Sequence, residues 1–235
     1  MLFRSHDLIA GRAAGMMTAG VLTGPATADD LAPLADGSAA KAADLAQAMN
    51  YDLSTGRFGR HSPVIAGTPP EIADLLLPHL PDLNLAALVT QMNLMATRAL
   101  MAEAVPLAPL LARLRARGLR LGLATNDAEV PARAHLASVG VAALFDFIAG
   151  SDSGHGGKPA PGMLLAFAAG LGLDPAEVLM VGDSAHDLIA GRAAGMMTAG
   201  VLTGPATADD LAPLADVVLP DIGHLPDWLD LNAAG

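Results

Sequence analysis

The chain contains no cysteine, few aromatic residues and no long uninterrupted apolar run. The absence of cysteine excludes disulfides, thiolate metal sites and cysteine nucleophiles, so any metal must be held by oxygen or imidazole ligands. No apolar run approaches the roughly 20 residues that a membrane-spanning helix needs. The N-terminal apolar stretch is interrupted by His6, Asp7 and Arg12, which is not typical of a secretory signal. We therefore expect a cytoplasmic protein with no membrane partner.

Positive charge is also scarce. Lysine and arginine together number 13 against 24 acidic residues, which gives a formal net charge of −11. A chain this acidic is repelled by nucleic-acid backbones and anionic lipids, so we exclude both as main partners. Apolar residues make up 52% of the 235 positions, enough for a sizeable core. Nothing in the composition indicates an oligomeric state.

One segment occurs twice. Residues 6–36 and 186–216 are the same 31 letters. Structural repeats lie next to one another and diverge in sequence, whereas these copies are far apart and identical. We therefore expect residues 1–36 to be a duplicated segment foreign to the fold, of natural or artefactual origin. Local propensity favours an extended segment over 18–22, which we expect either to replace a missing strand or to belong to a loosely attached arm.

From residue 105 to 235 apolar strands alternate with helices, which is typical of a parallel sheet covered on both faces. The sequence thus predicts an α/β fold with a Rossmann-like core. The expected helices are one that starts at Pro106 and ends at Gly118, then 128–138, 161–171 and 186–195. The expected strands are 119–124, 145–149, 178–182, 198–202 and 217–219.

Residues 38–104 have a different pattern and predict an all-helical insert before the core. Helices are expected near 38–49, 69–79 and 84–104. The second begins with Thr68-Pro69-Pro70-Glu71, a capping box with proline at the first helical position. The stretch 51–68 is rich in glycine and proline and is expected to be a long loop.

Polar residues stand at three of the predicted strand ends in the core. Thr125 and Asn126 follow strand 119–124, Lys158 lies in the loop after strand 145–149, and Asp183 and Asp187 follow strand 178–182. Ligands of open α/β sheets bind at the carboxyl ends of the strands. A hydroxyl and an amide can hold phosphoryl oxygens, an ammonium can neutralise developing charge, and two carboxylates can bind Mg²⁺. We expect these side chains to converge at one edge of the sheet.

Each of these segments alone has a simpler explanation. Thr-Asn is a common helix N-cap, Lys-Pro-x-Pro is a common exposed turn, and Asp183 or Ser184 could merely cap the next helix. Their order along the chain, each at a strand end, is what favours a phosphate site with a metal. Further residues that could contact a substrate lie in predicted loops, where a solvated turn is the simpler interpretation: His155, Arg57, Arg60 and His61.

These motifs resemble those of the haloacid dehalogenase-like hydrolases, and within them the phosphoglycolate phosphatase-like branch, over residues 38–235. The resemblance implies a Mg²⁺-dependent phosphatase that acts on a small phosphorylated metabolite. It implies that Thr125, Asn126 and Lys158 bind phosphate, with Thr125 and Lys158 catalytic. It also implies that Asp183 is a direct metal ligand, that Asp187 belongs to the metal site, and that 38–104 is a mobile cap which closes over the substrate.

The chain departs from this family at the nucleophile. The family reaction needs an N-terminal strand that ends in Asp-x-Asp, where the first aspartate attacks phosphorus and the second transfers protons. None of the 20 aspartates forms such a pair. We expect the lost segment to have stood just before residue 38, and we do not expect Asp7 of the duplicate to replace it. The chain is therefore expected to be inactive.

Two alternatives remain open from the sequence. One is a non-catalytic phosphate-binding or interaction protein of the same fold, which keeps Thr125, Asn126 and Lys158 without a nucleophile. The other keeps the fold and changes the chemistry to a haloacid dehalogenase or a sugar phosphomutase. The acidic pair Asp183 and Asp187 favours metal-dependent phosphoryl chemistry over dehalogenation. The sequence does not separate hydrolase from mutase.

Overall fold

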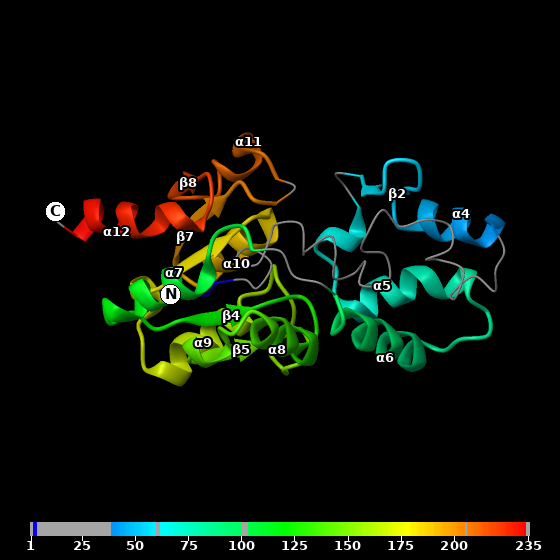
Figure 1. Ribbon diagram of the computed structural model, residues 1–235, viewed down its shortest axis with the longest axis horizontal. Helices are drawn as coiled ribbons and strands as arrows, with labels where there is room; N and C mark the ends of the chain where they lie inside the picture. The colour runs from blue at the N-terminus through cyan, green and yellow to red at the C-terminus, as the bar shows by residue number, and fades with distance from the viewer. Residues whose placement is uncertain (1, 4–38, 60–61, 100–102, 205, 234–235) are drawn as a thin grey trace. The chain divides into compact units, whose positions relative to one another are not determined.

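The computed structural model describes residues 2–3, 39–59, 62–99, 103–204 and 206–233. The chain divides into two compact units (Figure 1). The core unit contains residues 2–3 and 103–233 of the described part, and the helical unit contains residues 39–99. Within the described residues, no helix is long and apolar enough to cross a membrane.

The core unit is built on a six-stranded sheet with the order β5-β4-β1-β6-β7-β8. Every neighbouring pair in this sheet is parallel. The α/β class predicted from the sequence is confirmed, and the predicted strands lie within a few residues of their expected bounds. The strands are β1 (Leu2–Phe3), β4 (Gly122–Ala124), β5 (Phe147–Ala149), β6 (Leu179–Gly182), β7 (Met197–Val201) and β8 (Val217–Leu219).

Helices pack on both faces of this sheet because successive strand residues point to opposite sides. Leu123 and Val181 belong to one apolar cluster, with residues of α7, α8 and α12. Ala124 and Met180 belong to another, with residues of α9 and α10. The helices of the core unit are α7 (Leu107–Ala116), α8 (Glu129–Ser138), α9 (Gly162–Leu171), α10 (Ala185–Ala193), α11 (Ala208–Leu211) and α12 (Leu225–Ala233), with short 3-10 turns at Ala142–Leu144, Pro175–Glu177 and Ile222–His224.

The centre of the sheet is occupied by the two residues of β1. Leu2 pairs with Gly122 and Met180, and Phe3 pairs with Leu123 and Val181. This corrects the expectation that all of residues 1–36 is foreign to the fold and that 18–22 supplies any replacement strand. Leu2 and Phe3 lie outside the duplicated letters and can satisfy the inner backbone groups of both flanking strands. Residues 18–22 lie outside the described residues.

The helical unit contains α4 (Ala39–Ala48), α5 (Pro69–Leu76) and α6 (Leu85–Ala96), near the predicted positions. The capping box at Thr68 is confirmed, because the Thr68 N–H and hydroxyl both donate to the Glu71 carboxylate, at 2.7 and 2.8 Å. The unit is not all helical, however. The predicted loop contains an antiparallel hairpin of β2 (Tyr51–Asp52) and β3 (Arg57–Phe58), followed by 3-10 turns at Pro63–Ile65 and, after α5, Leu77–His79.

Candidate functional site

The candidate site lies at the carboxyl edge of the core sheet. Thr125, Asn126 and Asp127 directly follow β4, and Asp183 directly follows β6, the two strands on either side of β1. Thr125 and Asp183 are fully buried. Lys158 reaches the same edge from the loop after β5. The convergence predicted from the strand ends is therefore what the core unit contains.

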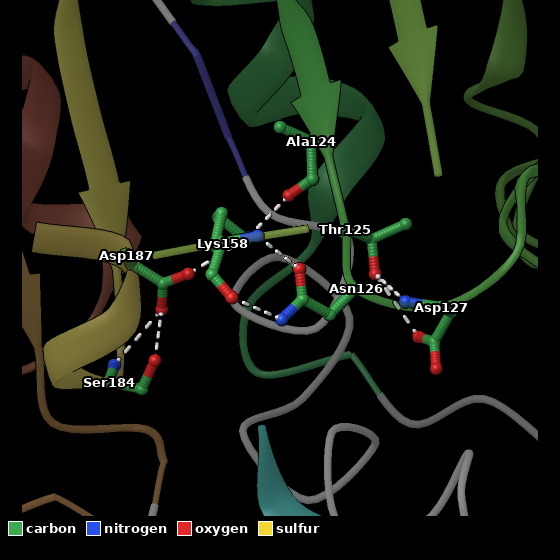
Figure 2. A network of polar contacts seen from close by, with 7 residues as sticks. All are labelled: Ala124, Thr125, Asn126, Asp127, Lys158, Ser184 and Asp187. Atoms are coloured by element: carbon green, nitrogen blue, oxygen red, sulfur yellow. Dashed lines mark hydrogen bonds and ion pairs between the residues drawn. The ribbon is translucent and has the colours of Figure 1, made fainter. Parts of the chain in front are cut away.

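Lys158 is a buried cation, only 3% exposed, and it contacts two oxygen atoms of the described residues (Figure 2). Its Nζ donates to the backbone carbonyl of Ala124 at 2.5 Å and forms an ion pair with Asp187 Oδ1 at 2.8 Å. A buried ammonium is tolerated only where such partners compensate its lost hydration. The ammonium is thus held between the ends of β4 and β6.

Asn126 fixes the backbone of Lys158 and thereby the start of its side chain. The Asn126 amide donates to the Lys158 carbonyl at 2.8 Å, and its Oδ1 accepts from the Lys158 N–H at 2.7 Å. The sequence predicted Asn126 as a phosphate ligand. These two hydrogen bonds give its side chain a positioning role, in which the end of β4 aligns a residue 32 positions away, and phosphate binding by Asn126 stays a prediction.

Asp187 joins the ion pair to the start of α10. Its Oδ2 accepts from the N–H of Ser184 at 3.1 Å and from the Ser184 hydroxyl at 2.7 Å, which is a capping box at the helix N-terminus. Gly182 allows this approach, since a Cβ there would lie 2.1 Å from the Cβ of Asp187. Both carboxylate oxygens of Asp187 therefore have partners within the protein.

Asp127 is a part of the site that the sequence analysis missed. The Thr125 hydroxyl donates to Asp127 Oδ2 at 3.1 Å, and the Asp127 N–H donates to Thr125 Oγ1 at the same distance (Figure 2). The carboxylate is 7% exposed. One feature of the sequence could have indicated it: Asp127 is an acidic residue that directly follows the predicted phosphate ligand Asn126.

Asp183 is enclosed by the loop after β7. A Cβ built on Gly204 would lie 2.1 Å from Asp183 Oδ2 and 2.3 Å from its Cγ. The backbone of Gly204 therefore lies directly against the carboxylate, and no larger residue fits there without moving it. This close approach limits the directions from which a ligand can reach Asp183.

The described residues do not make a complete metal site. Across the described part of the chain, no group of three or more histidine or acidic side chains could hold a metal ion. Asp183 is a suitable hard oxygen ligand for Mg²⁺, and Asp187, whose oxygens contact Lys158 and Ser184, stays a predicted member of the metal site. Within these residues the donor set for Mg²⁺ is therefore incomplete.

The remaining sequence candidates lie elsewhere or outside the described residues. His155 is exposed, with its ring centroid 6.3 Å from that of Phe147. The side chains of Arg57, Arg60 and His61 are outside the described part, as is Asp7. A contact between the helical unit and the site stays a prediction.

Comparison with known proteins extends over the site. A family model of haloacid dehalogenase-like hydrolases matches residues 93–195. The phosphoglycolate phosphatase of Rhodospirillum rubrum is 39% identical over 127 residues, which cover 54% of this chain and 52% of that protein. The phosphoglycolate phosphatase of Neisseria gonorrhoeae is 41% identical over 121 residues, 50% of each protein. The chain thus spans about half the length of the curated relatives it matches.

One solved structure is similar in fold to this chain over nearly its whole length. The crystal structure of a predicted phosphoglycolate phosphatase from Haemophilus somnus matches 97% of this chain and 96% of its own with a TM-score of 0.67. At 16% identity this match concerns the fold alone.

Proposed function

Because the chain belongs to the haloacid dehalogenase-like hydrolase superfamily, we propose that its core unit is a phosphatase core for a small phosphorylated metabolite of the phosphoglycolate kind. In this proposal residues 38–104 serve as the cap. The observation that carries the proposal is the buried ammonium of Lys158 at the carboxyl edge of the sheet, bonded to the carbonyl of Ala124, which precedes Thr125. A cytoplasmic location belongs to the proposal and rests on the substrate class, since charged small molecules do not cross bilayers unaided.

Lys158 is suited to phosphoryl binding because its position is fixed before any ligand arrives. A preorganised cation in a site shielded from water stabilises developing negative charge more than a solvated one. The Ala124 carbonyl and Asp187 hold the ammonium, and Asn126 holds the backbone. We assign Lys158 to charge neutralisation and Thr125 to hydrogen bonding with a phosphoryl oxygen.

We further propose that the chain with this sequence does not hydrolyse a phosphorylated substrate. In the sequence the central strand Leu2–Phe3 is followed directly by Arg4-Ser5-His6, where the resemblance calls for Asp-x-Asp. Without an attacking carboxylate, no aspartyl-phosphate can form. In this proposal the hydrolytic reaction depends on Mg²⁺, for which Asp183 is a suitable ligand among the described residues.

A second candidate function is a protein that binds phosphate without hydrolysing it. The observation in its favour is the same combination of a retained Lys158 and a missing nucleophile. Both candidates predict that the protein binds inorganic phosphate and that hydrolysis is absent. They differ in whether hydrolysis appears once the two missing aspartates of the Asp-x-Asp motif are introduced.

The test is to install them in the double variant Arg4→Asp/His6→Asp. With Mg²⁺ and phosphoglycolate or p-nitrophenyl phosphate, we expect no turnover by the parent chain and at least about a tenfold gain over background in the variant, about 1.4 kcal/mol. Adding Lys158→Met should abolish the gain, whereas Lys41→Met, at the only other lysine, should not.

The other outcomes are informative too. Turnover by the parent chain would refute the proposed defect. Phosphate binding with no turnover in the double variant would favour the non-catalytic function. If Lys158→Met left both phosphate binding and the activity of the double variant unchanged, the proposed site would be refuted.

A further inference from the structure

Asp127 occupies a position in which it competes with a bound anion for the hydroxyl of Thr125. A threonine hydroxyl has one proton to donate. In the core unit that proton goes to Asp127 Oδ2 at 3.1 Å, while the Oγ1 atom accepts from the Asp127 N–H. For Thr125 to donate to a phosphoryl oxygen, its hydroxyl must turn away from this carboxylate.

The charge balance of the edge adds to the competition. Among the residues that the structure describes, three buried carboxylates, those of Asp127, Asp183 and Asp187, lie at the ends of β4 and β6 with one buried ammonium, Lys158. The ammonium is already paired with Asp187. An incoming phosphate therefore replaces one charged acceptor on Thr125 by another and brings two anions close together, which is costly where water is excluded.

Hydrogen bonds hold the backbone of Asp127 in place beside Thr125. The Asp127 carbonyl accepts from the Ser151 N–H at 2.8 Å and from its hydroxyl at 3.3 Å. Gly150 packs closely against the same turn, where a Cβ would lie 2.6 Å from the Asp127 carbonyl oxygen. The loop after β5 thus fixes the turn that carries the competing group.

We propose that Asp127 sets the anion affinity of this site by restraining Thr125, and that it keeps the affinity for dianionic phosphate low. The inference rests on the proposed function, because it concerns the same phosphate site. Its consequence is easy release of inorganic phosphate and a preference for phosphoryl groups of lower charge. Asp127 acts through Thr125 and is a positioning residue, not a catalytic one.

The test measures the affinity of the full chain for inorganic phosphate by titration calorimetry. We expect Asp127→Ala to bind about tenfold more tightly than the parent, which corresponds to about 1.4 kcal/mol. Asp152→Ala removes a carboxylate from the same edge, one that accepts from the Glu129 N–H at 2.8 Å and does not touch Thr125. This control should leave the affinity unchanged.

A double-mutant cycle separates the effect of releasing the Thr125 hydroxyl from the effect of removing the Asp127 charge. In a Thr125→Val background, Asp127→Ala should give a gain of less than about threefold, because no hydroxyl is left to release. If Asp127→Ala does not fold, Asp127→Asn keeps the side-chain volume and should still tighten binding. Circular dichroism checks that each variant is folded.

Two results would count against the inference, and they are distinct. Unchanged or weaker phosphate binding in Asp127→Ala would show that Asp127 presents Thr125 to the anion instead of withholding it, and would overturn this inference alone. Absence of phosphate binding in the parent and in every Asp127 variant would overturn the proposed function together with it.

Discussion

Asp187 holds two parts of the core unit together through its two carboxylate oxygens. One contacts the Lys158 ammonium at 2.8 Å, and the other caps α10 through Ser184. From the sequence, Asp187 belonged to the metal site. Its contacts also give its charge a structural role, and its place in the metal site stays a prediction.

We therefore predict that Asp187→Asn destabilises the core unit by about 3–5 kcal/mol, because it leaves a buried ammonium without its counter-charge. Chemical denaturation followed by circular dichroism measures the loss. The exposed Asp209, in the first turn of α11, is the control, and Asp209→Asn should change the free energy of unfolding by less than about 0.5 kcal/mol. Equal stability of the two variants would contradict a structural role for the ion pair.

A second prediction at this scale concerns Gly204. Gly204→Ala would place a Cβ 2.1 Å from Asp183 Oδ2, so the carboxylate or the loop must shift, at a cost of about 1–3 kcal/mol. Gly170→Ala is the matched control, because Gly170 lies in α9 and a Cβ added there would meet no atom within 4 Å. That variant should gain about 0.5–1 kcal/mol from helix propensity. Thermal unfolding of both variants measures these changes. A Gly204→Ala variant as stable as the parent would show that the loop moves to admit the Cβ at little cost.

Single residues also show how far the sequence could predict the site. Thr125, Lys158 and Asp183 were predictable because parallel strands end at one edge of the sheet. The contact between the Asn126 amide and the Lys158 backbone was not, because it depends on the path of the loop between them. Asp127 was missed for a similar reason, since only the local turn brings its carboxylate back to Thr125.

At the scale of elements, β1 is the shortest strand of the core sheet and lies at its centre. Its two residues pair with β4 on one side and β6 on the other. A two-residue strand has no alternating pattern to detect, which is why the sequence did not predict it. The hairpin of β2 and β3 escaped prediction for the same reason, although Tyr51 and Phe58 pair across it with ring centroids 4.8 Å apart.

Phe3→Pro tests the assignment of the central strand. Proline lacks the N–H that a strand paired on both sides must donate, so each lost buried hydrogen bond costs about 1–3 kcal/mol. We expect a lower urea midpoint for the core unit. Val21→Pro makes the same change in the other segment that the sequence favoured for this place, and it should leave the midpoint unaltered. If only Val21→Pro lowered the urea midpoint, the central strand would have to be assigned to residues 18–22.

At the scale of the whole molecule, two groups of acidic side chains among the described residues have different tasks. Those at the carboxyl edge of the sheet, Asp127, Asp183 and Asp187, belong to the candidate site, where Asp187 pairs with Lys158. Asp146 and Asp216 precede β5 and β8 at the opposite edge, where Asp146 accepts from Arg115 at 2.6 Å and Asp216 from Arg192 at 2.8 Å. The second group ties helices to strand starts and does not touch the candidate site.

This second group makes stability sensitive to acid. Burial raises the pKa of Asp146 and Asp216, but hydrogen bonds from arginine side chains and from the Leu121 and Thr198 N–H groups outweigh it, so each pKa lies below the ordinary 3.8. A lowered folded-state pKa stabilises the protein above the unfolded-state pKa, and this contribution is lost as pH falls through the folded value.

We expect the free energy of unfolding to vary little through these two groups above about pH 5 and to fall as the pH drops below about 4. Urea titrations across that range measure the slope. Asp146→Asn should make the slope shallower, whereas Asp209→Asn should keep it. A slope that does not change in Asp146→Asn would assign the acid sensitivity to other groups.

The clamp of Asn126 on Lys158 has a consequence for how this protein can diversify. Lys158 is aligned by the end of β4, not by the loop that carries the chain from β5. That loop contains the exposed Gly154, with φ of 84°, and added residues there cost little closure entropy. Insertions at its tip can therefore change the rim of the site in evolution or engineering while the ammonium stays where it is.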